Sequence, residues 1–241
     1  MTRQFTTEEL ADRWFDKRDV LNLAGKYVTS ILLKKEGEVF DAFWAQDEDV
    51  CLCFHDGYYK GQAAVSGYYQ AVSHNTEVKS ALLKKMFPAQ LEGLSDAEVF
   101  GVGQLRSLPI TTPVIEIAAD RKTAKGIWHI EGSNNDISVK GPLSYWSIGF
   151  LCIDFIREED DWKLWHVFFA EDIACPMGQN WAAPQEPEDN PDFAALVDCV
   201  LPPYTGTGTF YVPYRADRPF TPPPKLPEPY ETFAETFSYG A

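Results

Sequence analysis

The stretch that decides the fold lies at residues 115–128 and reads Ile115-Glu116-Ile117-Ala118-Ala119-Asp120-Arg121-Lys122-Thr123-Ala124-Lys125-Gly126-Ile127-Trp128. Apolar and polar side chains alternate around a polar turn at 120–122, which is the pattern of a β-hairpin. The same pattern predicts a second pair of strands at 145–157 and 162–169, joined by the acidic residues 158–161. Because consecutive strands with tight connections pair antiparallel, this region predicts an antiparallel sheet.

The part of the chain before this hairpin favours helices. Thr6 and Glu9 have the spacing of a capping box, and the apolar residues that follow recur at helical intervals. We expect helices at about 7–18, from 19 to 37 and at 38–45, a strand at 50–55, and a further helix at 61–73. A block of helices followed by a block of strands predicts an α+β fold.

The composition is that of a folded globular protein, with 45% hydrophobic and 24% charged residues among 241. Lys and Arg number 21 against 36 Asp and Glu, and the net charge of −15 argues against nucleic acid and anionic membrane surfaces as partners. No run approaches the ~18 apolar residues of a membrane span. Five scattered cysteines and a polar N-terminus predict a cytoplasmic protein.

We expect a main domain at 1–175, with an insert at about 75–112, and an extended arm at 176–241. The arm holds 13 of the 17 prolines, which disfavour regular structure, yet it also holds a dozen large apolar side chains that need burial. Ile127 and Trp165 are expected on the outer side of the sheet. We therefore predict that the arm packs on the domain or on a partner subunit, and that the protein is a homodimer or a higher homo-oligomer.

Three segments resemble the nuclear transport factor 2-like superfamily, most closely its SnoaL-like branch. Residues 115–128 resemble the central hairpin of that superfamily, and residues 149–164 are similar to its final hairpin. The stretch Gly57-Tyr58-Tyr59-Lys60-Gly61 precedes a helix, as it does in the family. The resemblance covers about residues 8–172. It implies a cone-shaped α+β barrel, in which a curved antiparallel sheet and the N-terminal helices enclose one pocket.

The SnoaL-like branch holds polyketide cyclases, dehydratases such as scytalone dehydratase, isomerases and lyases that act on hydrophobic rings. The resemblance implies general acid-base chemistry without a cofactor on a small hydrophobic, aromatic or polycyclic compound. The sequence agrees, because it contains no phosphate-binding glycine loop, Walker motif or nucleophile elbow. The alternative is a non-catalytic module of the same fold that binds a small molecule or serves assembly.

Catalytic members of the branch commonly carry a Tyr and, five residues later, an Asp on the second helix. Tyr27 matches the Tyr, whereas Leu32 stands at the position of the carboxylate. Tyr27 is therefore either a hydrogen-bond donor to a substrate carbonyl or a residue of the core. Asp41 is the nearest substitute for the missing carboxylate, and its alternative is a solvated position on the third helix.

His166 and Asp154 are candidates for an acid-base pair on the final hairpin. Alternate residues of a strand share a face, so the length of the loop decides whether the two side chains meet. A three-residue loop sets residue 154 opposite residue 166, whereas the four-residue loop 158–161 sets residue 153 there and turns Asp154 to the other face. His55, at a strand end, is a further candidate acid or base, or else a turn residue bonded to local backbone.

Aromatic residues supply candidate walls for a flat ligand. The five that we select are Trp44, Tyr58, Tyr68, Trp128 and Trp146. Trp128 is expected to face the pocket and His129 the outer side. Cys51, Cys53 and His55 share one strand face, but no second cluster completes a tetrahedral site, so we expect no metal.

Overall fold

A computed structural model describes residues 5–103, 105–138, 141–182, 201–208, 211–234 and 238–239. The helices are α1 (Thr7–Leu32), α2 (Glu36–Phe43), α3 (Gln62–Met86) and α4 (Asp96–Gly101). The strands are β1 (Cys51–Cys53), β2 (Gly57–Lys60), β3 (Leu105–Ser107), β4 (Ile110–Ile117), β5 (Thr123–Ser138), β6 (Gly141–Glu158), β7 (Asp161–Pro176) and β8 (Gly206–Thr207).

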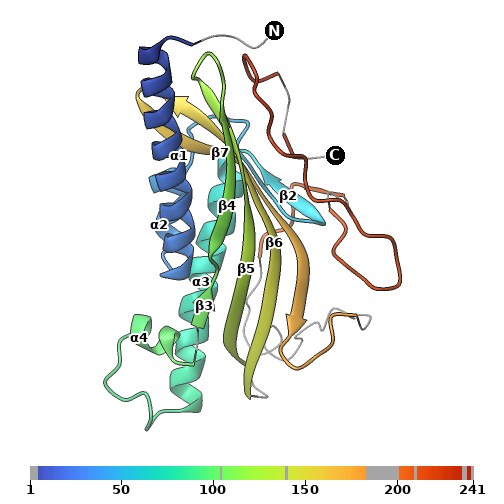
Figure 1. Ribbon diagram of the computed structural model, residues 1–241. Coiled ribbons are helices and arrows are strands. Elements are labelled where there is room, and N and C mark those ends of the chain that lie inside the picture. Colours follow the sequence, from blue (N-terminus) through green and yellow to red (C-terminus); the bar gives the residue numbers. More distant parts are fainter. Residues whose placement is uncertain are drawn as a thin grey trace.

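The strands form one curved, open sheet in the order β3-β5-β6-β7-β1-β2-β8, with β4 also paired to β5 (Figure 1). This confirms the α+β fold with a curved sheet. One pairing differs from the antiparallel expectation, because β1 runs parallel to β7. The reason lies at the end of α2, where Trp44 forms a parallel bridge with Leu164 and the backbone N–H of Ala45 donates to the Leu164 carbonyl. The chain therefore enters the sheet in the direction of β7.

Helix α1 is one continuous helix, so the expectation of separate helices at 7–18 and from residue 19 was wrong. The capping box at its start is present, with Thr6 and Glu9 bonded to each other's backbone N–H. Asp16, near the expected break, is 3% exposed and accepts hydrogen bonds from Arg121 at 2.6 Å and from Arg157 at 3.1 Å. These long-range partners hold a charged residue within the buried face of the helix.

The helix expected at 61–73 is also longer, because α3 continues to Met86. No glycine or proline interrupts 74–86, and Ser80 and Leu83 are buried in it. The second half of α3 and the short helix α4 lie in the segment at about 75–112 that was expected to be an insert. They share a small apolar cluster, in which Leu83, Leu91 and Val99 are buried.

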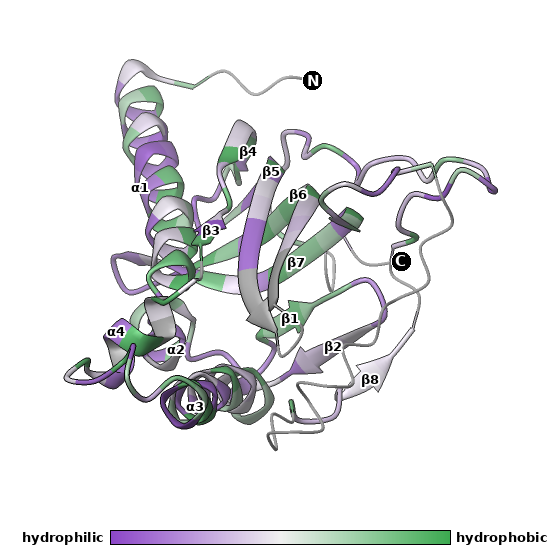
Figure 2. Cartoon of the chain, turned by 90° about the horizontal axis from the view of Figure 1, so that it is seen from below, coloured by the Kyte–Doolittle hydropathy of each residue, from purple (hydrophilic) through white to green (hydrophobic). Residues whose placement is uncertain are grey.

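Different parts of the chain pack on the two faces of the sheet. Trp128, Leu151 and Phe155 face the helices and belong to the main core. The opposite, outer face carries Ile127 and Phe168, which pack with residues of the C-terminal segment. Figures 1 and 2 show the helices on one side of the sheet and the C-terminal segment on the other.

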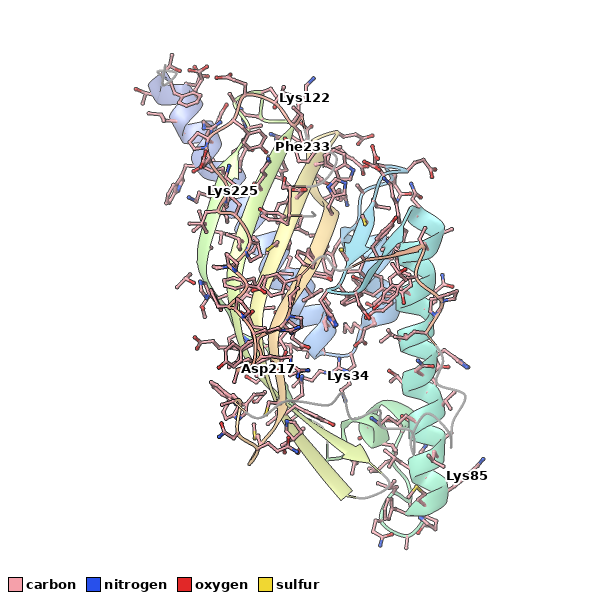
Figure 3. The ribbon with its side chains drawn as sticks, turned by 90° about the vertical axis from the view of Figure 1, so that its right-hand side faces the viewer. Lys34, Lys85, Lys122, Asp217, Lys225 and Phe233 are labelled. Carbon is pink, nitrogen blue, oxygen red and sulfur yellow. The ribbon has the colours of Figure 1, made fainter. Side chains whose placement is uncertain are left out.

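Of the C-terminal residues that the structure describes, 211–234 and 238–239 lie along the outer face of the sheet, as Figure 3 shows for Phe233 and Lys225. The Phe233 ring lies 4.8 Å from the ring of Trp165, and the Tyr230 carbonyl accepts a hydrogen bond from the N–H of Ala119. Tyr211 and Tyr239 are 5% and 8% exposed, so these aromatic side chains are buried against their own chain.

Among the described residues, none of the helices combines the length and the apolar character that crossing a lipid bilayer requires.

Candidate functional site

His166 and Asp154 form a buried pair. The Nδ1 atom of His166 lies 2.9 Å from the Oδ2 atom of Asp154, and the two residues are 1% and 0% exposed. The same carboxylate oxygen accepts a hydrogen bond from the backbone N–H of Ser238 at 3.1 Å. On the opposite side of the ring, Nε2 lies 3.8 Å from Asp49.

A β-bulge brings this pair together. Phe155 pairs with Leu164, so regular pairing would place Ile153 opposite His166. Trp165 is an extra residue in β7, and beyond it Asp154 pairs with His166. Next to the loop, β6 and β7 therefore pair in the register that the four-residue acidic loop predicts. Beyond the bulge at Trp165, the pairing is shifted by one residue.

The pair lies on the outer face of the sheet, not on the face covered by the helices. Cys152 and Phe168, which alternate with Asp154 and His166 on their strands, belong to the outer cluster with Tyr211 and Tyr239. Trp165 stacks on the His166 ring at a centroid distance of 4.3 Å. Phe233 and Ser238 contact the pair on this face, so the sheet separates the pair from the face that the helices cover.

Tyr27 lies in the main core between the helices and the sheet, and its hydroxyl pairs with that of Tyr69. Their oxygen atoms are 2.9 Å apart, and the residues are 0% and 2% exposed. Burial raises the pKa of both tyrosines, which therefore stay protonated at neutral pH. Leu32, at the position of the family carboxylate, packs against the same core.

The other candidates occupy different surroundings. Trp44 and Trp128 are buried and fill the interior, and Tyr68 packs partly buried beside them. Tyr58 packs against the outer cluster, Trp146 is 40% exposed, and Asp41 is exposed on α2. The structure thus brings Tyr27, Trp44, Tyr68 and Trp128 to the inner face and leaves Asp41, Tyr58 and Trp146 away from it.

Glu171 is an inner-face carboxyl that the sequence reasoning missed. Glu171 pairs with Gly149, which pairs in turn with Ile130. The neighbouring set of paired residues on the same face is Trp128, Leu151 and Phe169. The Oε2 atom of Glu171 accepts a hydrogen bond from the Ser147 hydroxyl at 3.1 Å. Burial raises the pKa of this carboxyl and outweighs the opposing effects of the Ser147 hydrogen bond and of His55.

A second β-bulge positions Glu171. Gly149 pairs with Glu171 and Ile148 with Ile173, so Asp172 is the extra residue. A Cβ at Gly149 would lie 2.2 Å from the Ala170 carbonyl oxygen and 2.9 Å from the Cα of Glu171. Glycine is therefore required where β7 bulges over β6. Asp172 turns to the outer face, where it accepts a hydrogen bond from the Tyr211 hydroxyl at 2.6 Å.

A small cavity adjoins Glu171. Its volume is about 50 Å³, and its walls are almost wholly apolar. The lining residues are Leu108, Ile130, Ser147, Ile148, Gly149, Phe150, Phe169, Ala170 and Glu171. His55 lies in the turn between β1 and β2, close enough for its charge to act on Glu171. An apolar cavity with one carboxyl of raised pKa is suited to proton transfer.

The sequence carried one signal for Glu171. Val167, Phe169 and Glu171 alternate along β7, so the side chain shares a face with two apolar residues. The final strand was expected to end at residue 169, and Glu171 therefore fell outside the candidates. No group of three or more His, Cys, Asp or Glu side chains suited to a metal ion occurs in the described part of the chain.

Comparisons with known proteins find similar solved structures at low identity. No family model matches the chain, and neither does any curated protein. A hexachlorocyclohexane dehydrochlorinase is 14% identical with a TM-score of 0.46, over 72% of this chain and 97% of that one. A putative scytalone dehydratase from Novosphingobium aromaticivorans is 11% identical with a TM-score of 0.46, over 73% and 99%. A putative dehydratase of the NTF2-like family from Streptomyces avermitilis is 15% identical with a TM-score of 0.44, over 68% and 98%.

Proposed function

We propose that this protein is a cofactor-independent enzyme of the lyase or isomerase type, with Glu171 as its acid-base group. The observation that carries the proposal is the position of Glu171 on the inner face beside an apolar cavity, where burial raises the pKa of its carboxyl. A general base works best when its pKa lies near the pH at which the enzyme operates, and burial moves a carboxyl in that direction.

In the proposed reaction, the Glu171 carboxylate removes a proton from a carbon atom next to a carbonyl, which gives an enolate, or from the carbon adjacent to the one that carries a leaving group, where a C=C bond forms as the bond to the leaving group breaks. The Ser147 hydroxyl, 3.1 Å from Oε2, holds the carboxylate in one orientation. His55 supplies the second proton, either to the leaving group or to another carbon of the substrate. His166 and Asp154 take no part, because they lie on the outer face.

Tyr27 has a supporting position in this proposal. Its ring centroid lies 6.4 Å from that of Phe169, which lines the cavity, so a side chain separates Tyr27 from the reacting atoms. Its hydroxyl is bonded to Tyr69 and fixes the wall behind Phe169. Trp44 and Trp128 are buried in the main core on the same face of the sheet, and Tyr68 packs partly buried against this core.

The substrate is a small, mainly apolar molecule. A cavity of about 50 Å³ is far below the ~300 Å³ of a typical ligand pocket, so a polycyclic compound does not fit the present arrangement of side chains. Phe169, which lines the cavity, stacks on Phe54 at a centroid distance of 6.0 Å. A substrate with one aromatic ring therefore requires the side chains around the cavity to move.

A second candidate function is a non-catalytic binding or assembly module. The filled interior favours it, because Tyr27, Trp44, Trp128 and Phe155 are each at most 2% exposed. In such a protein Glu171 would have no chemical role. The two functions therefore differ in whether replacing Glu171 changes any reaction.

The test is hydrogen exchange on carbon, which needs no knowledge of the natural product. A panel of small ketones is incubated with the protein in D₂O, and loss of the α-proton signal is followed by NMR. The wild-type protein is expected to accelerate exchange for at least one ketone, and Glu171→Gln is expected to lower that rate by about 10²-fold or more. Glu131→Gln, at an exposed position on β5, is the control. Equal rates in wild type and Glu171→Gln would refute the acid-base role.

A further inference from the structure

A buried ion pair at the β3 edge of the inner face is only partly satisfied. Glu36, the first residue of α2, is 4% exposed, and its Oε1 atom accepts a hydrogen bond from Arg106 at 3.2 Å. The other carboxylate oxygen, Oε2, is buried and has no hydrogen-bond partner in the described part of the chain. The Arg106 side chain is 36% exposed. Such a buried acceptor is costly for the fold unless a bound group donates to it.

Asn134 adds a second acceptor to the same place. It pairs directly with Arg106 across β3 and β5, and it shares strand parity with Ile130 and Trp128 on the inner face. Its Oδ1 atom is buried and, within the described residues, also has no hydrogen-bond partner. Arg106 is therefore bonded to a residue of α2 and paired in the sheet with a residue of β5, and each of these two residues has a buried acceptor oxygen without a partner in the described part of the chain.

Tyr68 on α3 faces this cluster. Burial raises the pKa of its hydroxyl to about 12, with Arg106 lowering and Glu36 raising the value, so both charges act on it. The hydroxyl is thus a neutral donor at physiological pH. Leu108, two residues beyond Arg106, lines the cavity next to Glu171 and connects the two parts of the inner face.

We infer that Glu36, Asn134, Arg106 and Tyr68 form a subsite for an uncharged polar head group that both donates and accepts hydrogen bonds, of the carboxamide or hydroxy-ketone class. A donor on the head group satisfies Glu36 Oε2 and Asn134 Oδ1, and an acceptor meets Arg106 and Tyr68. Glu36 already balances the charge of Arg106, so a carboxylate gains no net attraction. This inference rests on the proposed function, because it assigns the polar end of the same ligand.

The experiment compares three probes that differ only in their head group. Benzamide donates and accepts, acetophenone only accepts, and benzoate carries a negative charge. Their dissociation constants are measured by protein-observed NMR titration at neutral pH. We expect benzamide to bind about 10-fold or more tightly than either of the others, because a site with buried acceptors rejects a ligand that leaves them unpaired. Equal binding, or tightest binding of benzoate, would overturn the subsite.

Glu36→Gln makes the test specific to these residues. In this variant the amide oxygen can keep the bond to Arg106, and an NH₂ donor takes the place of the acceptor Oε2. Because the negative charge of Glu36 is also removed, the site should no longer prefer benzamide and should bind benzoate more tightly. Glu38→Gln, at a side chain 76% exposed on the same helix, should change nothing. If Glu36→Gln does not fold, Asn134→Leu should weaken benzamide binding alone. An unchanged benzamide preference in the folded variants would overturn the assignment.

Glu171→Gln separates this inference from the proposed function. The variant should abolish exchange on carbon and leave the preference for benzamide intact. Exchange that survives in Glu171→Gln, together with a benzamide preference, would refute the acid-base role alone. Loss of exchange without any preference among the probes would refute the subsite alone.

Discussion

Glu171 should make the stability of the protein depend on pH. Its pKa is raised in the folded state by burial, so the folded protein binds this proton more tightly than the unfolded chain does. The stabilising contribution is complete below the unfolded pKa and is lost as the pH rises through the folded pKa. Above the folded pKa, the charged carboxylate therefore opposes folding.

Glu171→Gln should accordingly raise the urea midpoint relative to wild type at pH 7, and the difference should shrink toward pH 4. The measurement is urea unfolding at both pH values, with Glu131→Gln as the exposed control. A variant that is less stable than wild type at pH 7 would show that the carboxylate stabilises the fold. Stability gained by removing a functional group is common at catalytic sites.

The hydroxyl pair of Tyr27 and Tyr69 should behave as one unit. Tyr27→Phe leaves the Tyr69 hydroxyl buried without its partner at 2.9 Å, at a cost of about 1–3 kcal/mol in unfolding free energy. The double change to Phe removes both hydroxyls and should cost less than the sum of the single changes. Chemical denaturation of the four proteins gives this coupling, and additive costs would argue against the bond.

At the scale of elements, the long helix α1 depends on Asp16. This side chain is 4% exposed and bridges Arg121 and Arg157. Asp16→Ala leaves two arginines next to the core without their carboxylate, and we expect a loss of about 3–5 kcal/mol. Asp12, which also contacts Arg121 but is 46% exposed, is the matched control, and its change to Ala should cost at most about 1 kcal/mol. Guanidinium unfolding measures both, and equal costs would contradict the bridging role.

Strand positions show how far the sequence could predict this fold. The alternation of apolar and polar residues predicted β4, β5 and the centres of β6 and β7. It also predicted the inner face for Trp128 correctly, because burial of apolar side chains fixes one face of a strand. The face of Asp154 could not be predicted, since the bulge at Trp165 shifts the register by one residue. The bulge at Asp172 likewise could not be predicted, and it places the side chains of Glu171 and Asp172 on opposite faces of the sheet. Bulges follow from three-dimensional packing and have no fixed sequence pattern.

At the scale of the whole molecule, the C-terminal segment supplies the second apolar layer of the sheet. Removing residues after Ala182 would uncover Ile127 and Phe168, which are 3% and 1% exposed. Each such side chain contributes about 1.5–3 kcal/mol when buried, so the truncated chain should melt at a lower temperature and bind a hydrophobic dye. Phe220→Ser, at a side chain 64% exposed in the same segment, should have no effect. A truncated chain with unchanged melting temperature would contradict this packing.

The predicted homodimer or higher oligomer is also a property of the whole molecule, and it requires a surface at which copies of the chain can meet. The outer sheet face is already covered by its own chain at Tyr211 and Tyr239, so an oligomer has to use another surface. Exposed apolar residues gather on the first half of α1, where Leu10 and Trp14 are 54% and 70% exposed. Sedimentation velocity of the wild-type protein and of Trp14→Glu checks whether copies associate through this helix.

The central claim is that Glu171 is an inner-face carboxyl beside an apolar cavity and that burial raises its pKa. Carbon-13 NMR of protein labelled at the glutamate carboxyl measures that pKa directly, with the Glu171 signal assigned by its absence from Glu171→Gln. The account predicts a titration midpoint above the ordinary value of 4.5. A midpoint at or below 4.5 would show a solvated or ion-paired carboxylate and would contradict the proposed acid-base site.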